Sequence, residues 1–189
     1  MEKTVIVVSG LPRSGTSMMM QMLDAGGVEV LTDNLRGPDE DNPKGYYEYE
    51  AVKATAEDPS WLDYAGGRAV KMVYRLLYDL PADRRYRVVF MKRDLEEVIK
   101  SQEVMLDRQG KSGGNLDHAR LVEVYDRQLA EARAWLDAQA NFDVLYVDFH
   151  DVLHDTGSVV DALDTFLGGG LHSDLMLRVP DAELYRVRG

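Results

Sequence analysis

Four short apolar runs alternate with amphipathic helical patterns, and this alternation restricts the fold more than any other feature of the sequence. The runs are rich in β-branched residues and bounded by polar or turn residues; they are Thr4–Val8, Ala69–Val73, Tyr86–Met91 and Asp143–Phe149. Strands buried on both faces form continuous apolar runs, and helices between them make parallel crossovers. We therefore predict an α/β, three-layer fold, with a parallel sheet of four to five strands and helices on both faces.

The predicted helices lie between and after these strands. Helical spacing of apolar residues covers Ser14–Ala25, Leu116–Gln139 and Ser158–Leu167. A further helix begins near Asp94, where Glu97 three residues later resembles a capping box. We see no internal repeat and no linker, so we predict one domain over residues 1–189.

Composition restricts the classes of function. The formal net charge is −11, from 33 acidic and 22 basic residues, which argues against nucleic acid or an anionic membrane surface as the main partner. The chain has no cysteine, so thiolate zinc sites and disulfides are excluded, and no apolar run approaches the roughly 20 residues of a membrane span. The N-terminus does not resemble a signal peptide, and we expect a cytoplasmic protein.

A glycine-rich loop follows the first strand. The segment from Ser9 to Ser17 reads SGLPRSGTS, and a helical pattern begins within it. Glycines let such a loop turn back on itself, its N–H groups point inward, and the helix N-terminus adds about half a positive charge. Strand, loop and helix together predict a phosphate-binding loop and hence a P-loop-type fold.

The loop departs from that of nucleoside triphosphate enzymes. Gly10 and Gly15 have the Walker A spacing, but Thr16 stands where ATP and GTP enzymes have lysine. The cation lies earlier, at Arg13. This difference argues against ordinary triphosphate chemistry.

The string Pro12-Arg13-Ser14-Gly15-Thr16-Ser17 resembles the 5′-phosphosulfate loop of the sulfotransferases that use 3′-phosphoadenosine-5′-phosphosulfate (PAPS). In that family the loop holds the 5′-phosphate and sulfuryl oxygens. The resemblance implies that these six residues bind PAPS as the donor substrate, and that Arg13 also binds the charge on the reacting group.

A second motif supports the resemblance. Arg93 follows the third strand, and Ser101 lies eight residues further on, as in the family's 3′-phosphate motif. From Asp94 to Ser101 is close to two helical turns, so Ser101 lies on the same helix face as the start of the helix. Arg93 can fork onto a phosphate while Ser101 donates its hydroxyl.

The candidate catalytic residues lie on the second predicted strand and in the segment before it. Lys71 resembles the lysine of the family's second strand, which implies a role in stabilising the leaving oxygen. The cytosolic members place a histidine two residues later, where this chain has Val73. Asp33 lies near the spacing at which the protein-tyrosine branch has its glutamate, and Glu48 is a rival candidate for the base, together with Glu50. Sulfuryl transfer requires no metal, and we expect no metal site.

A long polar segment, Leu31–Gly67, lies between the first helix and the second strand. Its aromatic residues either line an acceptor pocket or attach the segment to the core; they are Tyr46, Tyr47, Tyr49, Trp61 and Tyr64. The four histidines are interpreted as surface or turn residues, without the spacing of metal ligands.

The resemblance implies transfer of a sulfuryl group from PAPS to a hydroxyl or amine acceptor that the sequence does not name. Two alternatives stay open: a P-loop nucleotide kinase, and a non-catalytic nucleotide-binding protein. The expected partners are therefore a nucleotide donor and a small acceptor. Arg186 and Arg188 resemble the family's basic C-terminal loop only loosely.

Overall fold

A four-stranded sheet lies at the centre of the computed structural model, which describes residues 4–33, 35, 37, 45–108, 110 and 117–181. The strands are β1 (Val5–Gly10), β2 (Ala69–Val73), β3 (Tyr86–Lys92) and β4 (Phe142–Asp148), in the order β2-β1-β3-β4. All three strand pairs are parallel. The predicted α/β class and parallel sheet are confirmed. Arg186 and Arg188 lie outside the described residues.

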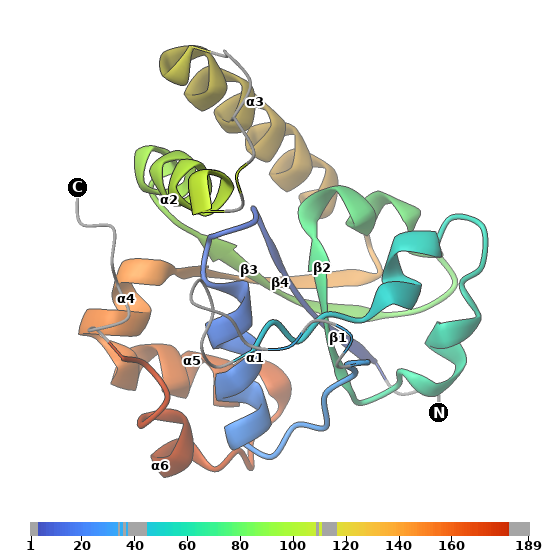
Figure 1. Ribbon diagram of the computed structural model, residues 1–189. Coiled ribbons are helices and arrows are strands. Elements are labelled where there is room, and N and C mark those ends of the chain that lie inside the picture. Colours follow the sequence, from blue (N-terminus) through green and yellow to red (C-terminus); the bar gives the residue numbers. More distant parts are fainter. Residues whose placement is uncertain are drawn as a thin grey trace.

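Helices cover both faces of the sheet (Figure 1). One face carries α1 (Thr16–Ala25), α4 (Phe149–His154), α5 (Thr156–Leu167) and α6 (Ser173–Met176). The other face carries α2 (Leu95–Arg108), α3 (His118–Asp137) and the 3-10 turns η1 (Glu50–Ala54), η2 (Ser60–Tyr64) and η3 (Tyr74–Asp79). The molecule thus has the three layers expected from its alternating sequence pattern.

The central strand β1 shows why its apolar run is continuous. Val5 and Val7 are buried against the layer of α2 and α3, whereas Ile6 and Val8 are buried against the layer of α1 and α5. Successive side chains of a strand point to opposite faces, so a sheet covered on both faces requires apolar residues at every position.

Several predicted boundaries differ from the structure by one or two residues, and two of the differences have a local cause. The first helix begins at Thr16 rather than Ser14, because Arg13 and Gly15 have left-handed backbone conformations that no α-helix continues. The fourth strand ends at Asp148 rather than Phe149. The Asp148 carboxylate accepts the N–H of His150 at 2.9 Å, and this cap starts α4, which the sequence pattern did not predict.

The segment Leu31–Gly67 contains η1 and η2 and has several apolar anchors. Trp61 is 1% exposed, and its Nε1 donates to the Thr55 hydroxyl at 3.0 Å. Val52 and Leu62 are buried in the same core. Trp61 therefore attaches the segment to the core, one of the two roles considered for its aromatic residues.

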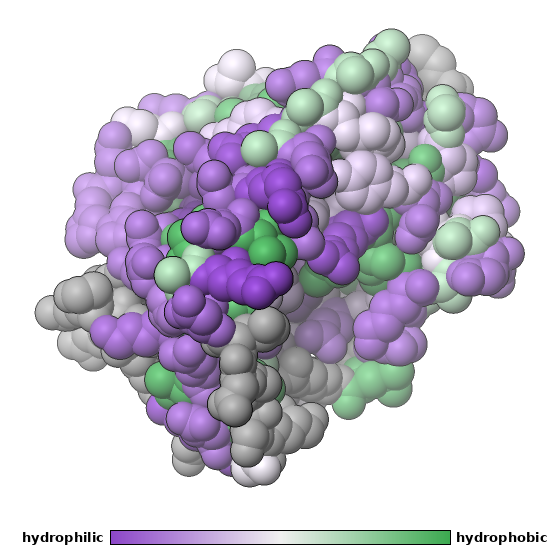
Figure 2. All heavy atoms as spheres, turned by 90° about the horizontal axis from the view of Figure 1, so that it is seen from above, coloured by the Kyte–Doolittle hydropathy of each residue, from purple (hydrophilic) through white to green (hydrophobic). Residues whose placement is uncertain are grey.

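The surface is consistent with this layered core. Figure 2 shows that the face seen from above is mostly hydrophilic, with hydrophobic side chains in separate small patches. Among the described residues, no helix is both long enough and apolar enough to cross a bilayer.

Candidate functional site

The carboxyl ends of the four strands bring the predicted site residues to one edge of the sheet. Gly10 lies opposite Val73 on one side and Met91 on the other, and Lys92 lies opposite Asp148. The loop after β1, the Arg93 side chain after β3 and the start of α4 after β4 therefore share this edge. Open parallel sheets generally bind ligands there.

The loop from Gly10 to Gly15 has an unusual backbone. Gly10, Arg13 and Gly15 all have positive φ, at 147°, 72° and 93°. A Cβ on Gly15 would lie 2.5 Å from a ring carbon of Phe149, so the loop packs directly on that ring. Arg13 adopts a conformation that is unfavourable for a non-glycine residue, and such residues concentrate at functional sites.

The loop leaves N–H groups available at the start of α1. The Ser14 hydroxyl donates to the Leu11 carbonyl at 2.7 Å, which closes the turn. Backbone pairing of α1 begins with the Met19 N–H, which donates to the Gly15 carbonyl. The N–H groups of Thr16 and Ser17 precede that bond, and with the helix dipole they favour an anion at this position.

The two predicted half-sites are in direct contact. Arg13 Nε donates to Ser101 Oγ at 3.0 Å, which joins the loop to α2. Arg93 Nη1 donates to the Arg13 carbonyl oxygen at 2.9 Å. The residues expected at the 5′ group and at the 3′-phosphate therefore form one cationic, hydroxyl-bearing cluster.

Arg93 is held on three sides. Its Nε lies 2.9 Å from Glu97 Oε2, and its guanidinium lies 4.3 Å from the centre of the Phe149 ring. The other carboxylate oxygen of Glu97 lies 3.1 Å from His150 Nε2. The Arg93 and Glu97 side chains are only 8% and 10% exposed, so this ion pair is largely shielded from water.

Lys71 lies beside the other end of the loop. Its Nζ is 3.3 Å from Ser17 Oγ and 3.9 Å from Glu48 Oε1, and it also donates to the Tyr46 carbonyl. Ser17 Oγ donates to the same carbonyl at 3.2 Å. The structure thus brings a lysine, a hydroxyl and a carboxylate together at the N-terminus of α1.

The segment that supplies Tyr46 and Glu48 is attached to α1 by Tyr47. The Tyr47 hydroxyl donates to Asp24 Oδ2 at 3.0 Å. Burial of the ring, followed by this hydrogen bond and the negative charge of Asp24, raises the pKa of Tyr47 to about 12. The hydroxyl is therefore protonated at physiological pH and remains a donor to Asp24.

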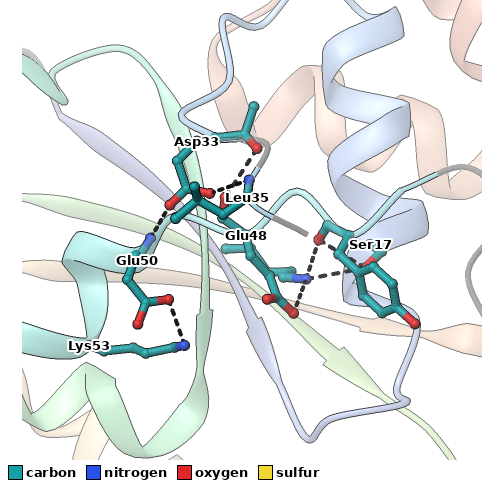
Figure 3. Close-up of polar contacts among 9 residues, drawn as sticks. Ser17, Asp33, Leu35, Glu48, Glu50 and Lys53 are labelled. Carbon is teal, nitrogen blue, oxygen red and sulfur yellow. Dashed lines mark hydrogen bonds and ion pairs between the residues drawn. The ribbon is translucent and has the colours of Figure 1, made fainter. Parts of the chain in front are cut away.

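Asp33 has different surroundings from Glu48. Its carboxylate accepts the N–H of Glu50 at 2.6 Å and the N–H of Leu35 at 3.0 Å. Figure 3 shows Asp33 directed toward Glu50 and Leu35, while the Glu48 side chain extends on the Ser17 side. Burial alone would raise the pKa of Asp33, but its backbone hydrogen bonds and nearby Lys53 lower it overall. Its geometry is that of a tether for η1.

Three site residues were not found by sequence reasoning: Glu97, Phe149 and His150. Glu97 was interpreted only as a helix-capping residue, Phe149 as the end of a strand and His150 as a surface or turn residue. A usable signal did exist, because Phe149 and His150 follow the fourth strand at the edge where the ligand was expected. No local pattern indicated that the Glu97 side chain would face Arg93 and His150.

Pro12 is exposed in the loop, and Thr16 is half-buried at the start of α1. In the part of the chain described, no three His, Asp or Glu side chains gather in a way that could hold a metal ion. The donor set of this edge consists of guanidinium, ammonium, hydroxyl and backbone N–H groups, which fits a phosphorylated or sulfated ligand.

Comparisons with known proteins show a likeness in structure but not in sequence. No family model and no curated protein matches the sequence. Retinol dehydratase in complex with androsterone and the inactive cofactor PAP matches in structure, with TM-score 0.51 and 17% identity over 92% of this chain. Mouse sulfotransferase SULT7A1 complexed with PAP matches with TM-score 0.58 and 15% identity over 95%. Sulfotransferase STF1 from Mycobacterium tuberculosis H37Rv matches with TM-score 0.59 and 18% identity over 100% of this chain and 74% of its own.

This chain spans 62% of the length of the retinol dehydratase chain and 63% of the SULT7A1 chain. At such identities the likeness concerns the fold. The chain has the fold of the sulfotransferases, and the resemblance predicted from two short motifs is confirmed at that level.

Proposed function

We propose, from a fold shared with PAP-bound sulfotransferases, that this chain binds PAPS and transfers its sulfuryl group to a hydroxyl or amine acceptor. The observation that carries the proposal is the Arg13–Ser101 hydrogen bond, with Arg93 bound to the carbonyl of Arg13. A donor with phosphate groups at both its 5′ and 3′ positions fits a cluster that joins a phosphate loop to a second pair of phosphate ligands.

Each part of the cluster has a role in the proposed binding mode. The loop from Pro12 to Ser17 binds the 5′ group through N–H and hydroxyl donors. Arg93 and Ser101 bind the 3′-phosphate, and Arg13 lies between the two groups. Bidentate guanidinium contacts and backbone N–H groups give both charge and orientation, which in-line transfer requires.

Lys71 is proposed to stabilise the leaving oxygen. It lies 3.3 Å from Ser17 Oγ, at the end of the loop where the charge of the 5′ group would develop. An ammonium group fixed at such a position stabilises the transition state more than the ground state, because the negative charge on the leaving oxygen increases during transfer.

Glu48 is proposed as the base that accepts the proton of the acceptor. Its carboxylate lies 3.9 Å from Lys71 Nζ, whereas the Asp33 carboxylate holds two backbone N–H groups away from the loop. The lowered pKa of Asp33 also makes it a weaker base. Of the acids considered, Glu48 has the geometry closest to the loop.

Isothermal titration tests the donor class. We expect adenosine 3′,5′-bisphosphate to bind without magnesium and more tightly than ADP, because Thr16 replaces the lysine of triphosphate enzymes. Tighter binding of ADP, dependent on magnesium, would instead support a nucleotide kinase.

A screen with radiolabelled PAPS then tests the transfer step. Label should appear on at least one hydroxyl or amine compound among sugars, phenols, peptides and lipid headgroups. Binding of the bisphosphate without transfer to any acceptor of these classes would support a non-catalytic nucleotide-binding protein.

A further inference from the structure

The Glu97 side chain makes contacts other than those expected of a capping box. In a capping box, the Asp94 side chain accepts the Glu97 N–H and the Glu97 side chain returns to the Asp94 N–H. The first of these bonds forms here, with Asp94 Oδ1 accepting the Glu97 N–H at 3.2 Å. The Glu97 carboxylate contacts Arg93, which follows β3, and His150, which lies in α4.

A carboxylate at this position has an electrostatic cost. Glu97 is 8% exposed and lies beside a cluster that is expected to bind a dianionic phosphate. Partial burial disfavours its charge, and that charge also opposes the incoming ligand. A glutamate that only capped the helix could remain exposed, as its neighbour Glu96 does. The burial of Glu97 therefore indicates a role within the cluster.

The contacts of Glu97 define that role. Its Oε2 holds the Nε edge of Arg93 at 2.9 Å, and its Oε1 lies 3.1 Å from His150. The Phe149 ring covers the Arg93 guanidinium and packs on Gly15 of the loop. Arg93 is thus fixed in the orientation in which Nη1 donates to the Arg13 carbonyl.

We infer that Glu97 is a positioning residue for recognition of the 3′-phosphate: it orients Arg93 for the phosphate, and His150 anchors its second oxygen. The inference rests on the proposed function. Orientation lowers the entropy lost by a long side chain on binding, so a fixed arginine binds phosphate more tightly than a mobile one. Glu97 itself need not touch the nucleotide.

The test compares two ligands that differ only in the 3′-phosphate: adenosine 3′,5′-bisphosphate and adenosine 5′-monophosphate. Glu97→Gln should reduce the affinity for the bisphosphate about three- to tenfold, the effect of misplacing one charge-assisted contact, with little change for the monophosphate. The ratio of the two affinities, measured by isothermal titration, is the readout. A merely structural role for Glu97 would weaken both ligands by the same factor and leave the ratio unchanged.

Glu96→Gln is the matched control, because Glu96 precedes Glu97 in the first turn of α2 but is exposed and contacts His118. It removes the same charge near the same site and should leave the affinity ratio unchanged or slightly raised. A double variant provides a second check. Arg93→Ala with Glu97→Gln should lower the ratio no further than Arg93→Ala alone, because Glu97 acts through Arg93.

Three results would overturn the inference. They are an affinity ratio that Glu97→Gln leaves unchanged, an affinity ratio that is higher in Glu97→Gln than in Glu96→Gln, and additive losses in the double variant. If Glu97→Gln does not fold, Glu97→Asp provides the same test, because its charge is kept while its carboxylate is one methylene further from Arg93. Failure of the wild type to prefer the bisphosphate would instead contradict the proposed function itself.

Discussion

Gly15 is the loop residue whose replacement the structure opposes most strongly. Its φ of 93° lies in the region that favours glycine, and the Phe149 ring occupies the space where a Cβ would be. The same ring contacts Arg93, so one glycine joins the loop to the proposed 3′ subsite. Sequence reasoning assigned Gly15 to a phosphate loop, and the structure adds two requirements for glycine here: the positive φ and the packing of Phe149.

Gly15→Ala should lower the free energy of unfolding by about 2–4 kcal/mol, from the unfavourable φ and the overlap with Phe149. Gly157→Ala is the matched control, because no atom lies within 4 Å of its added Cβ and it lies in the first turn of α5. That change should be neutral or add about 0.5 kcal/mol. Chemical denaturation measures both, and equal effects would contradict the packing of the loop on Phe149.

Glu48 and Asp33 differ in what their carboxylates contact, so their conservative variants should differ in turnover. With an acceptor found by the radiolabel screen, Glu48→Gln should lower kcat by about 10²- to 10⁴-fold, the usual contribution of a general base. Asp33→Asn should change kcat by less than about threefold, since it alters only the tether of η1. A larger loss in Asp33→Asn than in Glu48→Gln would reverse the assignment.

Side-chain contacts join helix α2 to β3 and to the loop after β1, and these contacts assemble the site. Helix α2 was predicted with its start at Asp94 and with Ser101 two turns on, and both features are present. The Arg93–Glu97 and Arg13–Ser101 contacts join this helix to β3 and to the loop. Such contacts between distant residues leave no periodic signal in a sequence, and for this reason Glu97 could not be assigned to the site beforehand.

The tether between Asp33 and η1 predicts a dependence of stability on pH. The pKa of Asp33 lies below its ordinary value of 3.8, so the folded state binds this proton more weakly than the unfolded state does. The carboxylate therefore contributes its full stabilisation at pH values above its ordinary pKa. This stabilisation is lost as the pH falls through the lower pKa of the folded state. Because Asp33 is only partly buried, the contribution is about 0.5 kcal/mol.

Asp33→Asn keeps an acceptor oxygen but removes the titration. Between pH 5 and pH 3, about the range of carboxylate titration, the wild type should lose slightly more stability than this variant. Denaturation at several pH values measures the difference. A variant that loses more stability than the wild type on acidification would contradict the tether.

At the scale of the whole molecule, the parallel sheet and its flanking helices could be predicted because burial on both faces imposes a continuous apolar pattern on each strand. The pairing of Val8 with Lys71 and of Lys92 with Asp148 then places the ends of the strands at one edge. Charge is distributed unevenly: a chain with net charge −11 gathers Arg13, Arg93 and Lys71 around one loop. Composition alone could not reveal this local cluster.

We propose that this edge of the sheet recognises a nucleotide with both a 5′ group and a 3′-phosphate. The measurement that tests it most directly is isothermal titration of wild type and Arg93→Ala with adenosine 3′,5′-bisphosphate and adenosine 5′-monophosphate. Arg68→Ala is the control, because Arg68 precedes β2 at the opposite edge of the sheet and pairs with Glu29. It removes the same charge far from the proposed site.

The wild type should prefer the bisphosphate, and Arg93→Ala should weaken its binding about ten- to hundredfold through loss of a charge-assisted contact. Monophosphate binding should change less than about threefold, because the loop N–H groups still hold the 5′ group. Arg68→Ala should leave both affinities unchanged. If Arg93→Ala weakened the two ligands equally, or if the wild type did not prefer the bisphosphate, this edge of the sheet would not be a site for the 3′-phosphate.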